Sequence, residues 1–348
     1  MIEIIKDKKT WSNLLTLVEN SDFYFTYDYH HSSKKINEHP ILVKYTDENT
    51  LFLLPLLLRD IDNTDYKDAT SVYGYAGVLT NKPYTINQKE EFQKELHNFF
   101  FNEKVVSVFS RLHPFFDYQE DLLSNLGQII IRGKVVYIDL KDTLENQRAK
   151  FNRRLKTHLN KSRKLCTVIK GNITNDLDTF IDLYHENMRR VDADESYFFN
   201  QDYFRALFNS NEFDAELLLS VHNVSKTIIG GAIFIKKGTI VQYHLSGLNE
   251  DYFDLQSIKL IIDEMRIKAT NEEYSFLNLG GGRGSDEDSL FRFKSNFSKD
   301  FKEFKLWKYI VNEKIYNELT KTKIDKDFKL DEENNFFPAY RSPILLIS

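Results

Sequence analysis

The chain has 348 residues, of which 41% are hydrophobic and 28% are charged, with 13 glycines and 6 prolines. This composition predicts a globular protein with a large core and excludes a disordered, collagen-like or low-complexity chain. The formal net charge of −5 argues against a surface that coats nucleic acid, although a local basic patch is compatible with it.

Cysteine content and hydropathy restrict the class of protein further. A single cysteine, Cys166, excludes an intramolecular disulfide framework and a cysteine-based zinc cluster. The longest apolar run, Leu51–Leu58, is far shorter than the roughly 20 residues that cross a bilayer. The N-terminus lacks a basic start followed by an apolar stretch, so it does not read as a signal peptide. We therefore expect a soluble, cytoplasmic protein without a transmembrane segment.

The first half of the chain predicts helices and strands in a regular order. Apolar periodicity and turn residues place helices over 10–19, capped by Thr10, and from about residue 26, then strands over 41–45 and 51–58. A long loop over 59–86 follows. The remaining predicted elements are a helix over 87–103, a strand over 105–110, a helix over 119–125 and a strand over 129–140.

The second half predicts the same order of elements. Its strands are expected over 215–222, 227–236 and 239–246, followed by a helix over 255–270, a strand over 275–279, a helix over 287–296 and a strand over 304–311. The apolar run 343–347 is expected to add a last strand. Because hairpins precede the crossover helices in both halves, we expect a duplicated α+β unit rather than a doubly wound sheet. The expected domains are 1–147 and 166–348, joined by a basic helix over 148–165.

The segment 148–164 contains eight lysines and arginines and no acidic residue. Leu155 and Leu159, four residues apart, give it the narrow apolar stripe of a helix. Two interpretations stay open, a solvated charged linker and a surface for RNA phosphates. The candidate nucleic-acid contacts are Arg153, Arg154, Lys161 and Arg163.

Several familiar catalytic patterns are missing from the sequence. It contains no His-Glu-x-x-His, Cys-x-x-Cys or EF-hand spacing, so we expect no metal. It also contains no Gly-x-Ser-x-Gly elbow. Cys166 lies beside basic residues, where a reactive thiol is conceivable, but a buried structural cysteine is the favoured interpretation.

A glycine-rich stretch carries the strongest local signal. Gly280, Gly281 and Gly282 leave a predicted strand and lead into a predicted helix, where backbone N–H groups and close ligand approach are expected. A tight turn with an acidic helix cap is the alternative. Further along that helix, Lys294 follows Phe293, and it is either partly buried and aimed at a substrate or simply solvated.

In the first half, Tyr73 and Tyr75 lie in a glycine-containing loop that suits a binding surface.

Seven segments, taken in order, resemble one family, the FemABX-type, peptidoglycan bridge-forming branch of the GNAT acyltransferase superfamily. No single motif is decisive, and the resemblance covers roughly residues 1–315. The segments are Phe25–His30, Pro55–Arg59, Asp68–Gly77, Tyr184–Arg189, Tyr197–Phe204, Leu279–Gly282 and Asp288–Phe297.

The resemblance implies two GNAT-like domains in tandem, with mixed, mostly antiparallel sheets flanked by helices. It implies direct transfer of an acyl or aminoacyl group to an amine of a cell-wall or surface-glycan precursor, without a covalent enzyme intermediate or a tightly bound cofactor. Phe293 and Lys294 match the family's Phe-Lys motif, and a lysine cation suits the developing oxyanion better than it suits a general base. The expected substrate-binding residues are Tyr73, Tyr75, Arg189, Tyr243, Ser246, Gly280, Gly281, Gly282 and Phe293.

The donor stays open between aminoacyl-tRNA and acyl-CoA. Acyl-CoA enzymes of the superfamily hold the pyrophosphate on glycine-rich N–H groups at a helix start. Here the corresponding stretch, 247–257, carries Glu250, Asp251 and Asp254 and has no glycine near the helix start, which modestly favours aminoacyl-tRNA. The alternatives are an acyl-CoA-dependent transferase acting on a nucleotide-linked amino sugar and a non-catalytic RNA- or precursor-binding protein.

Overall fold

The computed structural model describes residues 1–324 and 336–342, so the strand expected over 343–347 lies outside the described residues. The chain divides into two compact units. Unit 1 comprises residues 1–19, 24–132 and 304–348, and unit 2 comprises residues 20–23 and 133–303. In the described part of the chain, no helix combines the length and apolar character needed to cross a membrane.

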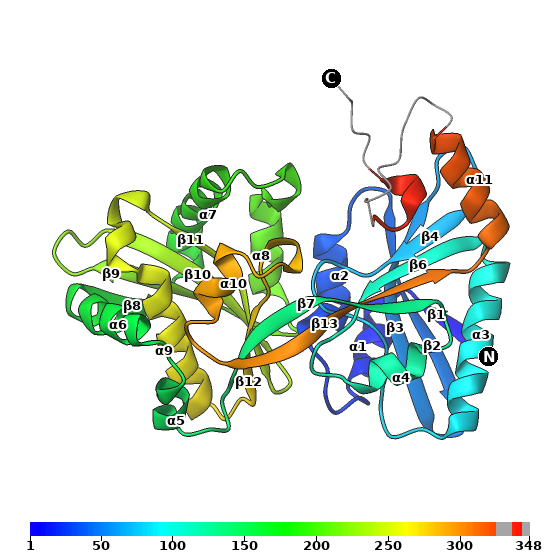
Figure 1. The fold of residues 1–348 in the computed structure, drawn as a ribbon, viewed down its shortest axis with the longest axis horizontal. Helices are drawn as coiled ribbons and strands as arrows, with labels where there is room; N and C mark the ends of the chain where they lie inside the picture. Colours follow the sequence, from blue (N-terminus) through cyan, green and yellow to red (C-terminus); the bar gives the residue numbers. More distant parts are fainter. Residues whose placement is uncertain (325–335, 343–348) are drawn as a thin grey trace. The chain divides into compact units, whose positions relative to one another are not determined.

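Unit 1 is built on a mixed sheet with the strand order β1-β2-β3-β4-β6-β13 (Figure 1). Only β4 and β6 are parallel neighbours in it. Its strands are β1 (Ile2–Ile5), β2 (Glu38–Asp47), β3 (Thr50–Asp60), β4 (Lys67–Thr70), β5 (Leu79–Thr80), β6 (Val105–Arg111) and most of β13 (Asp300–Ile310), and its helices are α1 (Lys8–Leu15), α2 (Tyr27–Ser33), α3 (Ile86–Asn102), α4 (Tyr118–Leu123) and α11 (Glu313–Ile324).

Both faces of β3 are buried, which explains its unbroken apolar sequence. Alternate residues of a strand point to opposite faces, and here Phe52 and Leu54 join the core under Phe92 of α3. Leu51 and Leu53 instead join the core that holds Trp11 of α1. The sheet of unit 1 is therefore a central layer between two helical layers.

Unit 2 has a sheet with the strand order β7-β12-β11-β10-β9-β8. Only the β11–β12 pair is parallel in it. Its strands are β7 (Gln128–Asp139), β8 (Cys166–Lys170), β9 (Asp214–His222), β10 (Ile228–Lys237), β11 (Ile240–Leu248) and β12 (Phe276–Gly280), and its helices are α5 (Leu144–Ala149), α6 (Arg153–Leu165), α7 (Ile173–Arg190), α8 (Gln201–Asn209), α9 (Ser257–Asn271) and α10 (Ser289–Lys294).

Two neighbouring glycines show which helices cover the faces of this sheet. A Cβ at Gly230 would meet Ser257 of α9 at 2.5 Å, and a Cβ at Gly231 would meet Phe180 of α7 at 2.7 Å. Since adjacent strand residues face opposite sides, α9 and α7 pack on opposite faces of β10. Glycine lets both helices approach the sheet closely.

The fold class is confirmed, since both units carry mixed, mostly antiparallel sheets flanked by helices. Nearly all predicted elements are present, but β1, α7, α8 and α11 were not predicted, and two local details differ. The expected loop over 59–86 contains the short strands β4 and β5. Asp7, and not Thr10, caps α1, because the Asp7 carboxylate accepts a hydrogen bond from the Thr10 N–H at 2.9 Å.

The units have other bounds than the domains expected at 1–147 and 166–348. Strand β13, from the end of the chain, pairs with β6 through Leu306–Ile310. Strand β7, from the first half, pairs with β12 through Val136–Asp139. Each half thus gives its last strand to the sheet of the other unit. Pairing between strands so far apart in sequence leaves no mark in local periodicity.

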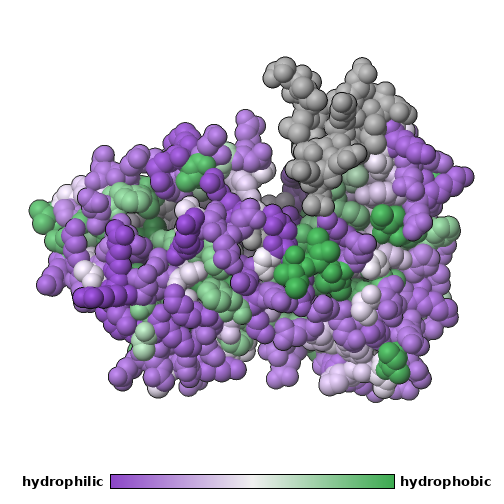
Figure 2. All heavy atoms as spheres, in the orientation of Figure 1, coloured by the Kyte–Doolittle hydropathy of each residue, from purple (hydrophilic) through white to green (hydrophobic). Residues whose placement is uncertain are grey.

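The segment 148–165 is not a linker. Helix α6 packs on α9, and Leu155 and Leu159 are buried in the core of unit 2. The face of the protein in Figure 2 is mostly hydrophilic, with apolar side chains in scattered patches.

Candidate functional site

Lys294 is a buried cation at the end of α10. Its side chain is 8% exposed, and its Nζ donates a hydrogen bond to the Gly281 carbonyl oxygen at 2.7 Å. Within the described residues no carboxylate forms an ion pair with it. Burial lowers the pKa of Lys294 to about 8, against the smaller opposing effect of the Asp288 carboxylate. The lysine is therefore still mostly protonated at pH 7 and titrates in an accessible range.

Asp288 sets the position of the short helix that carries Lys294. Its carboxylate accepts hydrogen bonds from the Phe291 N–H at 2.9 Å and from the Arg283 N–H at 3.2 Å. These backbone bonds lower the pKa of Asp288, although burial opposes them. A Cβ at Gly282 would lie 2.3 Å from the Asp288 carboxylate, so only glycine fits there. Asp288 of this acidic loop therefore caps a helix, as the turn interpretation expected, while the loop also receives Lys294.

Strands β11 and β12 separate beside this loop. Their parallel pairing joins Ile240–Gln242 to Phe276–Asn278 and goes no further, although β11 continues to Leu248. Strand β12 then has an irregularity between Asn278 and Gly280, where Gly280 takes a φ of +77°. The pairing of β11 with β12 thus ends at Gln242 and Asn278, and we call the place just beyond it the opening between these strands.

Tyr243 and Ser246 lie on β11 beyond the last pair with β12. Their hydroxyls are hydrogen-bonded to each other, and burial raises the pKa of Tyr243 to about 12. The Nζ of Lys294 lies 6.0 Å from the centre of the Tyr243 ring, within the range of a cation–π contact. Phe293 is half-buried and packs edge-on against Phe297 in the core of unit 2. The structure thus brings together Lys294, Tyr243, Ser246 and the loop from Gly280 to Gly282.

A buried chain of polar groups supports the opening, and the sequence analysis missed it. The Asp22 carboxylate accepts a hydrogen bond from the Gln242 amide, whose oxygen accepts one from the Asn278 amide at 2.9 Å. The Asn278 oxygen in turn accepts from the Gly280 N–H at 3.0 Å. All three side chains are at most 2% exposed. Satisfied networks of this kind fix a single backbone arrangement, here at the turn that Lys294 contacts.

His244 also escaped the sequence analysis. Its Nε2 is hydrogen-bonded to the Tyr203 hydroxyl at 2.8 Å, and its ring contacts Phe23. Burial lowers the pKa of His244 to about 3, so the ring is neutral. His244 lies at an irregularity of β11, and its contacts with Tyr203 of α8 and with Phe23 keep it apart from the Lys294 group.

Arg189 lies exposed at the end of α7. The loop after β12 reaches this end of the helix, because the Arg283 guanidinium donates to the Val191 carbonyl at 3.1 Å. A substrate contact by Arg189 stays a prediction.

Tyr73 and Tyr75 belong to unit 1, whereas the residues around Lys294 belong to unit 2. Tyr73 is 51% exposed, and the Arg111 guanidinium lies 5.9 Å from its ring centre. Tyr75 is half-buried and contacts the rings of Tyr24 and Phe304 edge-on. Gly74, between the two tyrosines, has a φ of +123° and leaves no room for a side chain against Tyr24. The binding role of both tyrosines stays a prediction.

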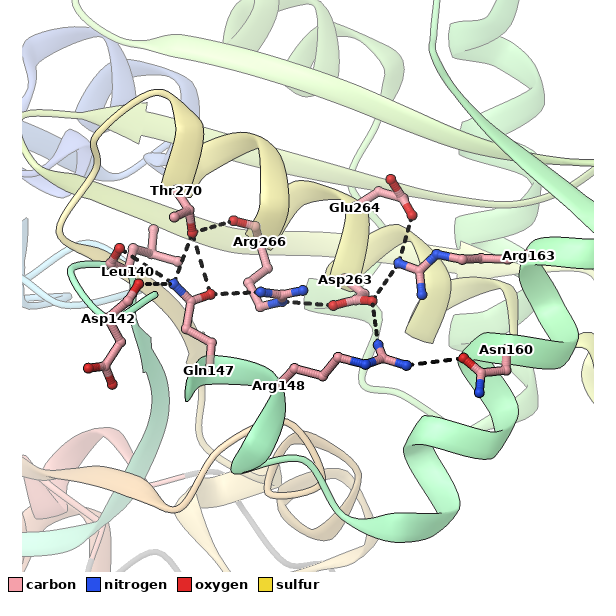
Figure 3. Close-up of polar contacts among 10 residues, drawn as sticks. All are labelled: Leu140, Asp142, Gln147, Arg148, Asn160, Arg163, Asp263, Glu264, Arg266 and Thr270. Carbon is pink, nitrogen blue, oxygen red and sulfur yellow. Dashed lines mark hydrogen bonds and ion pairs between the residues drawn. The ribbon is translucent and has the colours of Figure 1, made fainter. Parts of the chain in front are cut away.

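The basic segment is partly used for internal contacts (Figure 3). The Arg163 guanidinium donates to the fully buried carboxylate of Asp263 at 2.6 Å and to Glu264 at 2.9 Å. Arg148 forms an ion pair with the same Asp263 at 3.7 Å, and Arg266 donates to it at 2.7 Å. Arg163, a candidate for nucleic-acid contact, is thus paired with carboxylates of α9, and a nucleic-acid contact by it stays a prediction. The other three candidates, Arg153, Arg154 and Lys161, are exposed on α6.

Cys166 is buried, and burial raises the pKa of its thiol, which fits the structural interpretation and not a reactive thiol. In the part of the chain that the structure describes, no three His, Cys, Asp or Glu side chains gather in a way that suits a metal ion.

Comparison with known proteins gives one family model and a set of similar folds. The model of the FemAB family matches residues 222–305. This segment includes β10, β11, α9, β12 and α10, and with them Lys294 and the opening between β11 and β12. No curated protein matches the sequence significantly.

Among solved structures, FemX matches with a TM-score of 0.70 at 14% identity, over 90% of this chain and 99% of FemX. The C-terminal domain of a putative lysylphosphatidylglycerol synthetase from Agrobacterium fabrum matches with a TM-score of 0.55 at 13% identity, over 89% of this chain and 93% of that one. A conserved protein of unknown function from Bacteroides thetaiotaomicron matches with a TM-score of 0.58 at 12% identity, over 89% of this chain and 100% of that one. These likenesses show the fold.

The family match and the fold both agree with the resemblance stated from the sequence. The chain has the FemX fold over most of its length, and the FemAB pattern lies on the segment that builds the candidate site. The resemblance to the FemABX-type branch of GNAT-like acyltransferases is thereby confirmed.

Proposed function

We propose that this protein transfers an aminoacyl or acyl group to an amine of a cell-wall or surface-glycan precursor. One observation carries the proposal: Lys294, a buried lysine without a carboxylate partner among the described residues, lies beside the opening between β11 and β12. Burying a cation without a counter-charge is unfavourable for folding, and such groups gather at functional sites. The FemAB pattern covers this same segment.

The reaction needs a positive group more than it needs a nucleophilic side chain. The acceptor amine attacks the carbonyl carbon of the donor, a C–N bond forms, and the carbonyl oxygen becomes an oxyanion. The bond to the leaving oxygen or sulfur then breaks, and the proton that the amine sheds goes to this leaving atom. A preorganised cation beside the oxyanion contributes about 10²–10³ in rate. We assign this task to the Lys294 ammonium.

Charge at the start of α9 bears on the choice of donor. Glu250, Asp251 and Asp254 lie exposed on the 3-10 turn Glu250–Leu255 that precedes α9. Gln256, at the α9 N-cap, makes no side-chain capping bond. Three carboxylates oppose a pyrophosphate at this position, so we favour aminoacyl-tRNA over acyl-CoA as donor.

A transfer assay with a matched pair of lysine variants tests the proposal. Purified protein is offered aminoacyl-tRNA pools carrying labelled amino acids, or labelled acetyl-CoA, with amine-bearing cell-wall precursors and nucleotide-linked amino sugars as acceptors. Lys294→Met keeps the length of the side chain and removes the charge. Lys299→Met is the control, because Lys299 is exposed in the same region and contacts only the Ser295 carbonyl, at 3.2 Å, in the described structure.

We expect wild-type transfer that falls about 100-fold in Lys294→Met and stays within twofold in Lys299→Met, with donor binding retained in both. Transfer from acetyl-CoA and not from aminoacyl-tRNA would contradict the tRNA donor. It would support the alternative function, an acyl-CoA-dependent transferase that acts on an amino sugar. Donor binding without transfer to any acceptor would contradict the enzyme and support the alternative of a non-catalytic binding protein.

A further inference from the structure

Four basic side chains meet where α6 packs against the first turn of α9. Arg154, His158 and Lys161 stand at positions i, i+4 and i+7 of α6 and so share one face of that helix. Lys259 comes from the first turn of α9, and its Nζ lies 3.1 Å from His158 Nδ1. We call these four residues the α6–α9 cationic cluster.

Within the described residues, no acidic side chain forms an ion pair with this cluster, although three exposed carboxylates lie on the turn before α9. The pKa of His158 is lowered by burial and then by Lys259, Arg154 and Lys161, and the pKa of Lys259 is lowered by burial and then by Arg154. All these neighbouring charges are positive. Nearby basic residues differ, because Arg163 is paired with Asp263, and Lys150 is paired with Asp142 and Asp300. The positive end of the α9 dipole adds to the unfavourable charge at Lys259.

The cluster offers hydrogen-bond donors only. The Lys259 ammonium donates to His158 Nδ1, so the ring proton of a neutral His158 lies on Nε2, which is then a donor as well. The arginine and lysine heads add further N–H donors. Phosphate is the matching ligand, because its oxygens accept hydrogen bonds and its negative charge removes the mutual repulsion.

From this geometry we infer that the α6–α9 cationic cluster binds a phosphate group of the donor substrate. This inference rests on the proposed function, whose donors both carry phosphates. The cluster also adjoins the candidate site, because Lys259 Nζ lies 5.9 Å from the centre of the Phe293 ring, and Phe293 precedes Lys294 in α10. The cluster therefore lies beside the helix that carries Lys294.

Single charge removals on α6 and α9 test the inference. We would measure the binding of an RNA hairpin with a single-stranded CCA end, and of CoA, to the full-length protein at several salt concentrations. The test variants are Lys259→Gln and Arg154→Gln. Lys156→Gln is the matched control, because it removes one positive charge from α6 outside the cluster, where Lys156 contacts the Ala149 carbonyl at 3.3 Å. Melting temperatures verify that each variant is folded.

We expect both cluster variants to weaken binding about tenfold and to lower the salt slope by about one ion each, while Lys156→Gln stays within twofold. This pattern for the hairpin would identify an RNA phosphate, and the same pattern for CoA would identify its pyrophosphate. Equal losses in all three variants would show only diffuse attraction and overturn the cluster as a site. Binding of both probes that is unchanged in Lys259→Gln and Arg154→Gln would also overturn it.

The Lys294→Met variant separates this inference from the proposed function. Its binding of the hairpin or CoA should equal that of the wild type, because Lys294 lies outside the cluster. Cluster-dependent binding in a protein that transfers nothing would leave the phosphate site standing and remove the enzyme. Acyl transfer by the wild type, together with donor binding that is unchanged in Lys259→Gln and Arg154→Gln, would support the enzyme and remove the phosphate site.

Discussion

At the scale of single residues, Lys294 combines a cost to folding with a use in chemistry. Its pKa of about 8 lies below the ordinary value of 10.5 because burial disfavours the charged form. The unfolded chain therefore binds more protons than the folded one between these two values, and stability rises as the pH rises through this window. A residue that lowers stability at neutral pH is typical of a site where function limits stability.

This cost predicts that Lys294→Met stabilises the protein at pH 7. Removing the buried charge should raise the free energy of unfolding by about 2 kcal/mol, after the loss of the hydrogen bond to Gly281 is taken into account. The gain should shrink above pH 8 and be nearly gone at pH 10.5. Urea unfolding at several pH values measures it, with Lys299→Met as a control expected to stay within about 0.5 kcal/mol. A variant less stable than the wild type at pH 7 would show that the buried charge is compensated.

The sequence indicated some residues of this site and not others, for a physical reason. Lys294 and the glycines from Gly280 to Gly282 are local signals, because a strand, a turn and a helix follow one another there. The chain from Asp22 through Gln242 to Asn278 joins residues more than 200 positions apart. Asn278 and Gln242 do interrupt apolar strands, a signal that could have marked them as buried polar residues. Asp22 gave no such sign.

At the scale of elements, α6 shows how the same residues support two interpretations. Its apolar stripe correctly predicted a helix, but the number of its charges said nothing about their partners. The fully buried carboxylate of Asp263 on α9 gathers Arg148, Arg163 and Arg266 (Figure 3). Part of the basic segment is thus packing, and only the part without carboxylate partners in the described structure is free to attract a ligand.

The Asp263 ion network predicts a strong contrast between two neighbouring acidic residues. Asp263→Ala should lower the free energy of unfolding by about 3–5 kcal/mol, because it leaves guanidinium groups without their buried counter-charge. Glu264→Ala should cost less than about 1 kcal/mol, because Glu264 is the half-exposed partner of Arg163. Chemical denaturation of both variants measures the difference. Equal losses of unfolding free energy in the two variants would mean that the buried ion pairs of Asp263 stabilise the fold no more than the surface ion pair of Glu264 does.

At the scale of the whole molecule, the repeated order of elements was predictable, but helices α7 and α8 and the partners of the last strands were not. The two halves repeat hairpin, helix, strand, helix, strand, and this repetition is visible in periodicity. The exchange of β7 and β13 between the units depends on pairing between distant segments, which register and burial decide only once the sheets form.

The exchange predicts how fragments of the chain behave. A fragment over 133–303 keeps the part of β7 that pairs with β12 and keeps α6 on α9, so it should melt cooperatively. A fragment over 166–348 lacks β7 and α6 and should show no cooperative transition. Circular dichroism during heating distinguishes them. A cooperative transition in 166–348 but not in 133–303 would contradict the division into these units.

The pH dependence of transfer tests the central claim, that a buried Lys294 cation acts on the reacting centre. We would measure kcat/KM for acyl transfer from pH 6 to 10, because this quantity reports the pKa values of the free enzyme. The account predicts a decline in wild-type activity with a midpoint near pH 8, as Lys294 loses its proton, and a decline displaced beyond pH 10 in Lys294→Arg, whose guanidinium keeps its charge. A decline at the same pH in both proteins would contradict it.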